Sequence, residues 1–98
     1  MNKVAVDQAA KDYWKLLWKD YGEALVRDIP RRLKAALVDN KKVASVNETA
    51  TLIPVAHARS GDEIHIEGIY KDKGAKLMFH ASLDKDGNVK ELKSFDLR

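Results

Sequence analysis

The chain has 98 residues, of which 45% are hydrophobic and 34% are charged, and its formal net charge is +3. This balance excludes a disordered or membrane-embedded chain, and the length favours a single domain over residues 1–98 with one modest core. The chain has no cysteine, which removes disulfides, thiolate metal sites and a cysteine nucleophile. The first residues show no signal-peptide pattern and no long apolar run follows, so we expect a cytoplasmic protein without a membrane partner.

The first predicted element is an amphipathic helix that starts after Asp7. Apolar residues recur at spacings of three and four as far as Leu25, which places them on one helical face. Asp7 is suited to the N-cap, because its carboxylate can accept a hydrogen bond from a free backbone N–H. Pro30 lacks a donor and disfavours helix at the residue before it, which predicts a break at 28–30 and a second short helix to about Asn40.

From Val43 onward the apolar pattern is typical of strands. The candidate strands cover about 43–59 (with a possible break at Glu48), 63–71, 75–84 and 89–97. Gly, Asp and Asn occur in the separators, which are too short for parallel crossovers and therefore favour hairpins. The sequence predicts an α+β fold, in which an N-terminal helix, broken near Pro30, packs on a curved antiparallel β-meander of about four strands.

A register based on short turns gathers apolar side chains on one face of this sheet. It places Tyr70 opposite Ala75, Ile66 opposite Phe79, and Ile64 between Ala58 and Ala81. The predicted inner face consists of Leu52, Ala56, Ala58, Ile64, Ile66, Tyr70, Leu77, Phe79, Ala81 and Leu83. Apolar residues of the last strand do not keep this alternation, which predicts a β-bulge there.

The same register aligns three histidines on the opposite, outer face, with His65 between His57 and His80. Neutral imidazoles are common ligands of Zn²⁺, and Glu67 would add an oxygen. Neighbouring strands lie about 4.8 Å apart, so ligands in a row suit a tetrahedral site poorly. We therefore expect no metal and favour either a solvated polar face or a pH-sensitive interface, because imidazolium groups repel each other.

Apolar residues surround these histidines, and a half-apolar outer face is typical of a surface that a partner covers. We therefore expect a homodimer through the open sheet face. The predicted interface consists of Ile53, Val55, His57, His65, Glu67, Ile69, Met78 and His80. The alternative is an uncovered face, because isolated apolar side chains are normal on protein surfaces.

Aromatic residues suggest a second kind of site. Tyr13, Trp14 and Trp18 of the helix, with Tyr70 of the sheet, would line a small-ligand pocket between helix and sheet. In a domain of this size such residues more often form the core.

Other motifs are better explained by structure than by function. Segment 84–88 resembles part of a calcium loop but lacks the later acidic ligand, so we interpret it as a hairpin turn. A local basic cluster would suit phosphate, but an exposed helical face explains it, and we do not expect nucleic-acid binding. Its members are Arg27, Arg31, Arg32 and Lys34.

The order of elements, a long helix, a helical break and a curled antiparallel sheet, resembles the cystatin-like group of folds, which includes the nuclear transport factor 2-like superfamily. Segment 86–96 is similar to the final hairpin of many members, in which a turn glycine precedes an apolar residue and an acidic residue ends the strand. The resemblance implies a helix held by a sheet, frequent dimerisation through the sheet and, in some members, a small-molecule cavity. No position matches a catalytic motif, so no catalytic residue and no cofactor are carried over.

We therefore expect a non-enzymatic binding or interaction module that forms a homodimer. The alternative is a small-ligand binder or minor enzyme of the nuclear transport factor 2-like type, with its pocket between helix and sheet. An unidentified small molecule or protein partner is compatible with either hypothesis.

Overall fold

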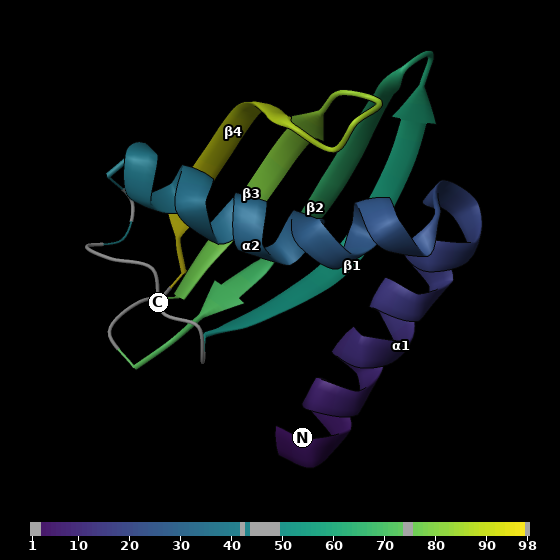
Figure 1. Cartoon of the computed structure of the whole chain (residues 1–98). Coiled ribbons are helices and arrows are strands. Elements are labelled where there is room, and N and C mark those ends of the chain that lie inside the picture. Colours follow the sequence, from purple (N-terminus) through teal and green to yellow (C-terminus); the bar gives the residue numbers. More distant parts are fainter. Residues whose placement is uncertain (1–2, 42, 44–49, 74–75, 98) are drawn as a thin grey trace.

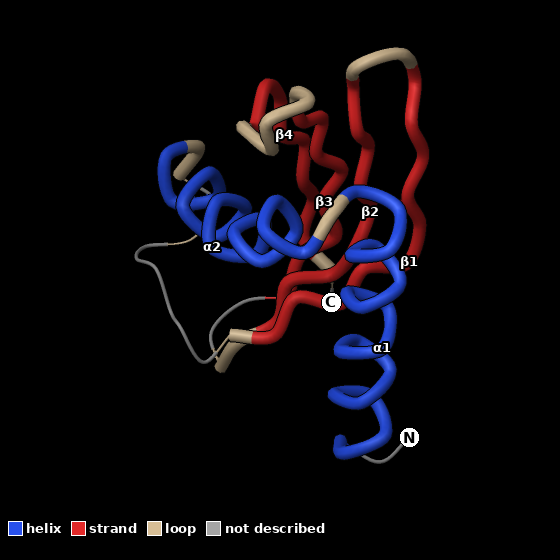
Figure 2. Tube along the Cα trace, turned by 45° about the vertical axis from the view of Figure 1, so that its right-hand side comes forward, coloured by secondary structure: helices blue, strands red, loops and turns tan. Residues whose placement is uncertain are grey.

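The structure is a computed structural model that describes residues 3–41, 43, 50–73 and 76–97. Its elements, in chain order, are α1 (Lys3–Tyr21), α2 (Glu23–Asp39), β1 (Thr51–Ser60), β2 (Glu63–Lys71), β3 (Lys76–Leu83) and β4 (Val89–Asp96). The strands form an antiparallel sheet of order β1-β2-β3-β4, with α2 across one face and α1 beside β1 (Figures 1 and 2). The α+β architecture predicted from the sequence is confirmed.

The helical break lies at Gly22 and not near Pro30, as the sequence had suggested. Gly22 has a φ of 94°, a left-handed conformation that glycine adopts without steric cost. Pro30 lies inside α2, at a cost of about 3 kcal/mol. Four buried aliphatic side chains, each contributing about 2 kcal/mol, outweigh that cost. These side chains are Val26, Ile29, Leu33 and Leu37.

The beginning of α1 also differs from the prediction. The helix starts at Lys3, so Asp7 lies inside it and is not its N-cap. The part of the first strand predicted before residue 50, with its break at Glu48, lies outside the described residues apart from Val43. None of the described helices is long and apolar enough to cross a membrane.

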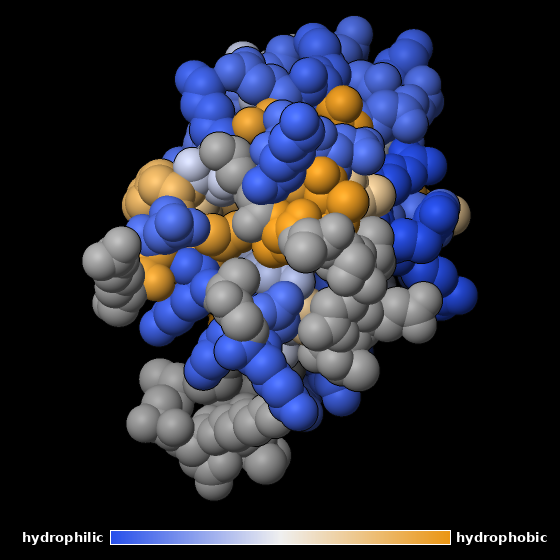
Figure 3. Space-filling view, turned by 90° about the vertical axis from the view of Figure 1, so that its left-hand side faces the viewer, coloured by the Kyte–Doolittle hydropathy of each residue, from blue (hydrophilic) through white to orange (hydrophobic). Residues whose placement is uncertain are grey.

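The core lies between α2 and the inner face of the sheet. Eight of the ten residues predicted for that face are buried, whereas Ala56 and Ala58 are exposed. A register shift between Pro54 and Ala56 explains the error, because a β-bulge inserts one residue and reverses the alternation beyond it. Figure 3, which faces the β4 edge, shows a mostly hydrophilic surface with small apolar patches.

The pairing of β2 with β3 is displaced by two residues from the prediction, so that Ile66 lies opposite Ala81 rather than Phe79. A displacement of two leaves every side chain on its predicted face. The bulge predicted in the last strand is present at the start of β4. Beyond it, Leu92 packs against the core, whereas Phe95 is exposed.

Segment 84–88 is a turn between β3 and β4 that is attached to α2. Asp84 Oδ1 accepts hydrogen bonds from the backbone N–H groups of Asp86 and Asn88, both at 2.9 Å. These bonds, the one from Asn88 first, lower the pKa of Asp84, so their stabilising effect is lost as the pH falls below about 4. Arg32 Nη1 donates to the carbonyl oxygen of Asp86 at 2.7 Å, which fixes the turn against the helix.

Gly68 offers a test of the packing inside β2. A Cβ there would lie 2.6 Å from the carbonyl oxygen of Ile53 and 2.9 Å from Cζ of Phe79. Because the backbone oxygen belongs to the neighbouring strand, Gly68→Ala should lower the free energy of unfolding by about 3 kcal/mol, as overpacking does. The control, Gly61→Ala, meets no atom within 4 Å and should cost only about 1 kcal/mol through its positive φ. Urea denaturation measures both values, and an equal loss of unfolding free energy in the two variants would contradict this account.

Candidate functional site

An apolar row crosses the outer face of the sheet, the face away from α2. Each member is paired with the next across neighbouring strands, so their side chains stand side by side. The apolar row consists of Ile53 in β1, Ile69 in β2, Met78 in β3 and Phe95 in β4. The Phe95 side chain is 61% exposed, which is unusual for an aromatic residue in a domain with so small a core.

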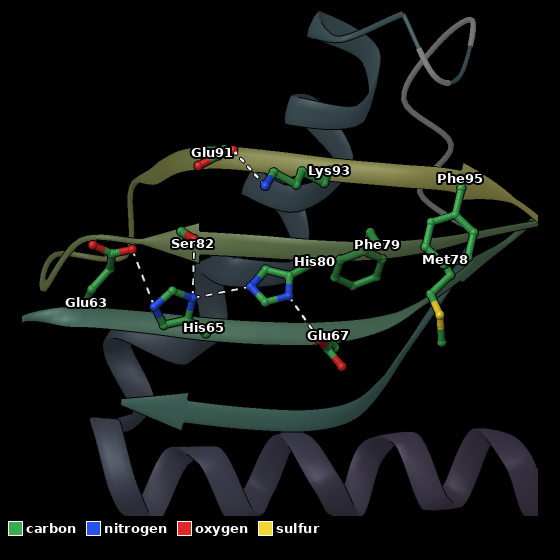
Figure 4. Close-up of a pocket in the computed structure, with 10 residues that line it drawn as sticks. All are labelled: Glu63, His65, Glu67, Met78, Phe79, His80, Ser82, Glu91, Lys93 and Phe95. Carbon is green, nitrogen blue, oxygen red and sulfur yellow. Dashed lines mark hydrogen bonds and ion pairs between the residues drawn. The ribbon is translucent and has the colours of Figure 1, made fainter. Parts of the chain in front are cut away.

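Two further rows lie beside the apolar row on the same face. The charged row comprises Glu67, His80 and Lys93, and the polar row comprises His65, Ser82 and Glu91, in each case from β2, β3 and β4. Together with Met78 and Phe95 these side chains line a hollow of about 580 Å³, shown in Figure 4. The outer face therefore has an apolar end and a titratable end.

Four titratable side chains form a continuous chain along this hollow (Figure 4). Glu63 Oε1 lies 3.4 Å from His65 Nε2, and Glu67 Oε1 lies 2.9 Å from His80 Nδ1. Between these ends, His65 Nδ1 and His80 Nε2 are 3.3 Å apart. The two histidines thus separate two carboxylates, one at each end of the chain.

The number of protons on the two imidazoles limits the hydrogen bonds that these four side chains can form. Two neutral imidazoles carry two N–H groups, whereas the three links need three donors. One additional proton completes the chain, and a second would turn two N–H groups toward each other between His65 and His80. Without the additional proton, the hydroxyl of Ser82, 3.3 Å from His65 Nδ1, can donate to that nitrogen in place of His80.

His57, predicted to stand beside His65, lies elsewhere. The β1 bulge places His57 opposite Ile66, whose side chain faces the core, and so turns it toward α1. Among the described residues, no group of three His, Cys, Asp or Glu side chains is placed to hold a metal ion.

His57 joins α1 to β1. Its Nδ1 lies 2.9 Å from the hydroxyl of Tyr13, and its Nε2 lies 3.4 Å from Asp20 Oδ2. The carboxylate favours a proton on Nε2, which leaves Nδ1 to accept the hydrogen bond that the Tyr13 hydroxyl donates. Burial raises the pKa of Tyr13, so its hydroxyl keeps this proton.

The four aromatic residues predicted to line one pocket lie in three places. Tyr13 contacts His57, while Tyr70 is fully buried in the core and donates its hydroxyl hydrogen to Asp72. Burial, followed by that hydrogen bond, raises the pKa of Tyr70 to about 12. Trp14 and Trp18 lie together in a groove between α1 and α2.

Of the predicted interface residues, six lie on the outer face, Val55 is exposed in the β1 bulge, and His57 has turned inward. The sequence analysis missed Phe95, Lys93 and Glu91. Their signal was the broken alternation of the last strand, but the pattern did not locate the bulge that turns them outward.

The charge of the basic cluster on α2 is partly balanced by neighbouring carboxylates. Arg27 pairs with Glu23, and Arg31 and Arg32 pair with Asp28 at 3.6 and 3.8 Å. These pairs reduce the field that a phosphate backbone would meet.

Comparison with known family models and with curated protein sequences gives no match. Comparison with solved structures finds a de novo designed β-sheet protein described as having a cystatin fold. The likeness covers 74% of this chain and 96% of the designed chain, at 21% sequence identity and a TM-score of 0.45. This cystatin-like resemblance is one of fold alone.

The Tyr13–His57 contact can be tested through stability. Tyr13→Phe removes a donor to a half-buried imidazole and should lower the free energy of unfolding by about 1 kcal/mol. The matched control is Tyr21→Phe, because Tyr21 packs edge-on against the same ring, at a centroid distance of 5.9 Å, and its hydroxyl has no hydrogen bond among the described residues. Thermal or urea denaturation should separate the two variants, and equal losses would exclude the hydrogen bond as the cause.

Proposed function

We propose that the protein is a non-enzymatic interaction module that forms a homodimer through the outer face of its sheet. The observation that carries the proposal is the apolar row, which spans all four strands and ends in the exposed ring of Phe95. Burial of such a row is the main favourable contribution available to association on this face. A cytoplasmic location is part of the proposal, because the cysteine-free chain needs no oxidising compartment.

The three rows support one particular symmetry. A two-fold axis in the plane of contact, parallel to β3, keeps each row opposite the same row and places β2 over β4 of the second copy. Ile69 then meets Phe95 of the second copy, which buries the apolar ends together. The same rotation preserves the strand direction, as in aligned sheet packing.

The charges of the other two rows are complementary in this arrangement. Glu67 meets Lys93 of the second copy, and His65 meets Glu91 of the second copy. Because the axis is two-fold, each contact occurs twice. The residues of β3 lie on the axis, so each outward side chain of β3 faces the same residue of the second copy. Like charges are therefore kept apart except at His80.

The outer face is large enough for a small specific interface. With the axis along β3, β1 projects beyond the second copy and three strands overlap. At about 4.8 Å between strands and about eight residues of about 3.3 Å each, these strands present roughly 380 Å² in flat projection. The accessible area of a surface with projecting side chains exceeds its flat projection, but it places this interface among the smaller ones, below the roughly 800 Å² per partner of a standard interface.

A second candidate function uses the same hollow to bind a small molecule. Its volume of about 580 Å³ and its mixture of apolar, acidic and imidazole groups favour the binding of a small molecule. A dimer of the proposed geometry would cover the hollow, so the two functions compete. A monomer that retains a discrete small molecule in native mass spectrometry would support the second candidate against the first.

Replacement of an exposed apolar residue by a charge tests the interface. Phe95→Glu should convert a dimer into a monomer, because it places a charge in the apolar row without disturbing the core. The matched control is Leu16→Glu, since Leu16 is 49% exposed on α1, away from the outer face. Sedimentation velocity gives the mass of each, and circular dichroism verifies the fold. A monomeric parent protein, or an unchanged dimer in Phe95→Glu, would overturn the proposal.

The proposed arrangement makes the dimer sensitive to acid. A second additional proton on the His65–His80 pair would bring facing N–H groups and like charges into the contact. The dissociation constant should therefore rise at least tenfold in acidic buffer. A double variant, His65→Gln with His80→Gln, should lose this dependence, whereas the control His57→Gln should keep it. A dimer whose affinity does not change with pH would contradict the role given to the pair.

A further inference from the structure

A groove between the two helices lies away from the proposed interface. It has a volume of about 310 Å³ and is lined by Trp14 and Trp18 of α1 and by Val26 and Pro30 of α2. Its surface is almost entirely apolar, although the surrounding helical surface carries many charges. Because Trp14 Nε1 donates to the carbonyl oxygen of Leu52 at 3.4 Å, this indole ring is held in place against β1.

Three cationic side chains surround this apolar floor. Lys11 and Lys15 lie one turn apart on α1, and Arg27 approaches from α2. The charge of Arg27 is shared with Glu23. Lys11 and Lys15 are both exposed, and neither has an ion pair with a residue whose side chain the structure describes (residues 8–41, 43, 50–73 and 76–97). Among these side chains the rim carries an excess of positive charge.

These features define the chemistry of a ligand. The apolar floor disfavours a small polar anion, which would gain no contact there to offset its lost hydration. The cationic rim favours an anion over a neutral or positively charged amphiphile. The volume is at the lower end of the range for small-molecule sites, which suits a short alkyl or aryl tail.

We propose that this groove binds a small amphipathic carboxylate, with its apolar tail on the indole rings and its carboxylate between Lys11 and Lys15. The site differs from a pocket between helix and sheet, because both its walls are helices. It also lies on the helical side of the sheet, whereas the proposed dimer uses the opposite face. A ligand in the groove and a second copy on the sheet can therefore be bound together, and each proposal can fail alone.

The protein contains its own probe for this site. Trp14 and Trp18 are its only two tryptophans, so intrinsic fluorescence reports on the groove without a label. Octanoate should shift or quench the emission saturably. The neutral analogue 1-octanol, with the same chain length, should bind at least fivefold more weakly, and octylammonium more weakly still. No saturable change with octanoate, or equal affinity for all three compounds, would overturn the proposal.

Charge variants then test where the carboxylate binds. The double variant Lys11→Gln with Lys15→Gln should weaken octanoate binding by about tenfold and leave 1-octanol binding unchanged. The matched control, Lys19→Gln with Lys71→Gln, loses the same charge outside the groove and should bind octanoate like the parent protein. Circular dichroism verifies that the helices are intact. Equal octanoate affinity in the two double variants would overturn the assignment of the site.

Discussion

The β-bulge between Pro54 and Ala56 decides what β1 contributes to each face of the sheet. A strand alternates its side chains strictly, so one extra residue exchanges the faces for everything beyond it. His57 is thereby turned toward α1, where it contacts Tyr13 and Asp20, while Ala58 is released to solvent. The bulge thus both attaches the first helix to the sheet and limits the outer face to two histidines.

Much of the fold could be predicted because β2 and β3 keep a regular period of two. A displacement of two residues in their pairing left the inner face intact, so an inexact register still gave the right core. The helices were predicted less well, because the rule for Pro30 describes a local cost and takes no account of burial on the sheet. Gly22 ends the first helix instead, and glycine alone is a weaker signal in a sequence than proline.

The candidate site was predictable to the same extent as the strands that carry it. His65 and His80 lie on the predicted face because β2 and β3 are regular, and their rings meet at 3.3 Å between the nitrogens. His57 was misplaced because a bulge of one residue leaves no mark in hydrophobic periodicity when small alanines follow it. In β4 the broken alternation did indicate a bulge. The position of the bulge, which sets the orientation of Phe95, could be located only from the pairing of β4 with β3.

The charges on the outer face connect the histidine pair to the proposed association. Glu63, Glu67 and Glu91 face two ammonium groups, since Lys90 lies 3.3 Å from Glu63 and Lys93 lies 3.5 Å from Glu91. Burial of these groups against an apolar surface would leave charges removed from water without compensation. The two-fold arrangement avoids this cost, because it places Glu67 opposite Lys93 of the second copy and His65 opposite Glu91. The charged groups of the outer face therefore favour a second copy of this chain over an apolar partner.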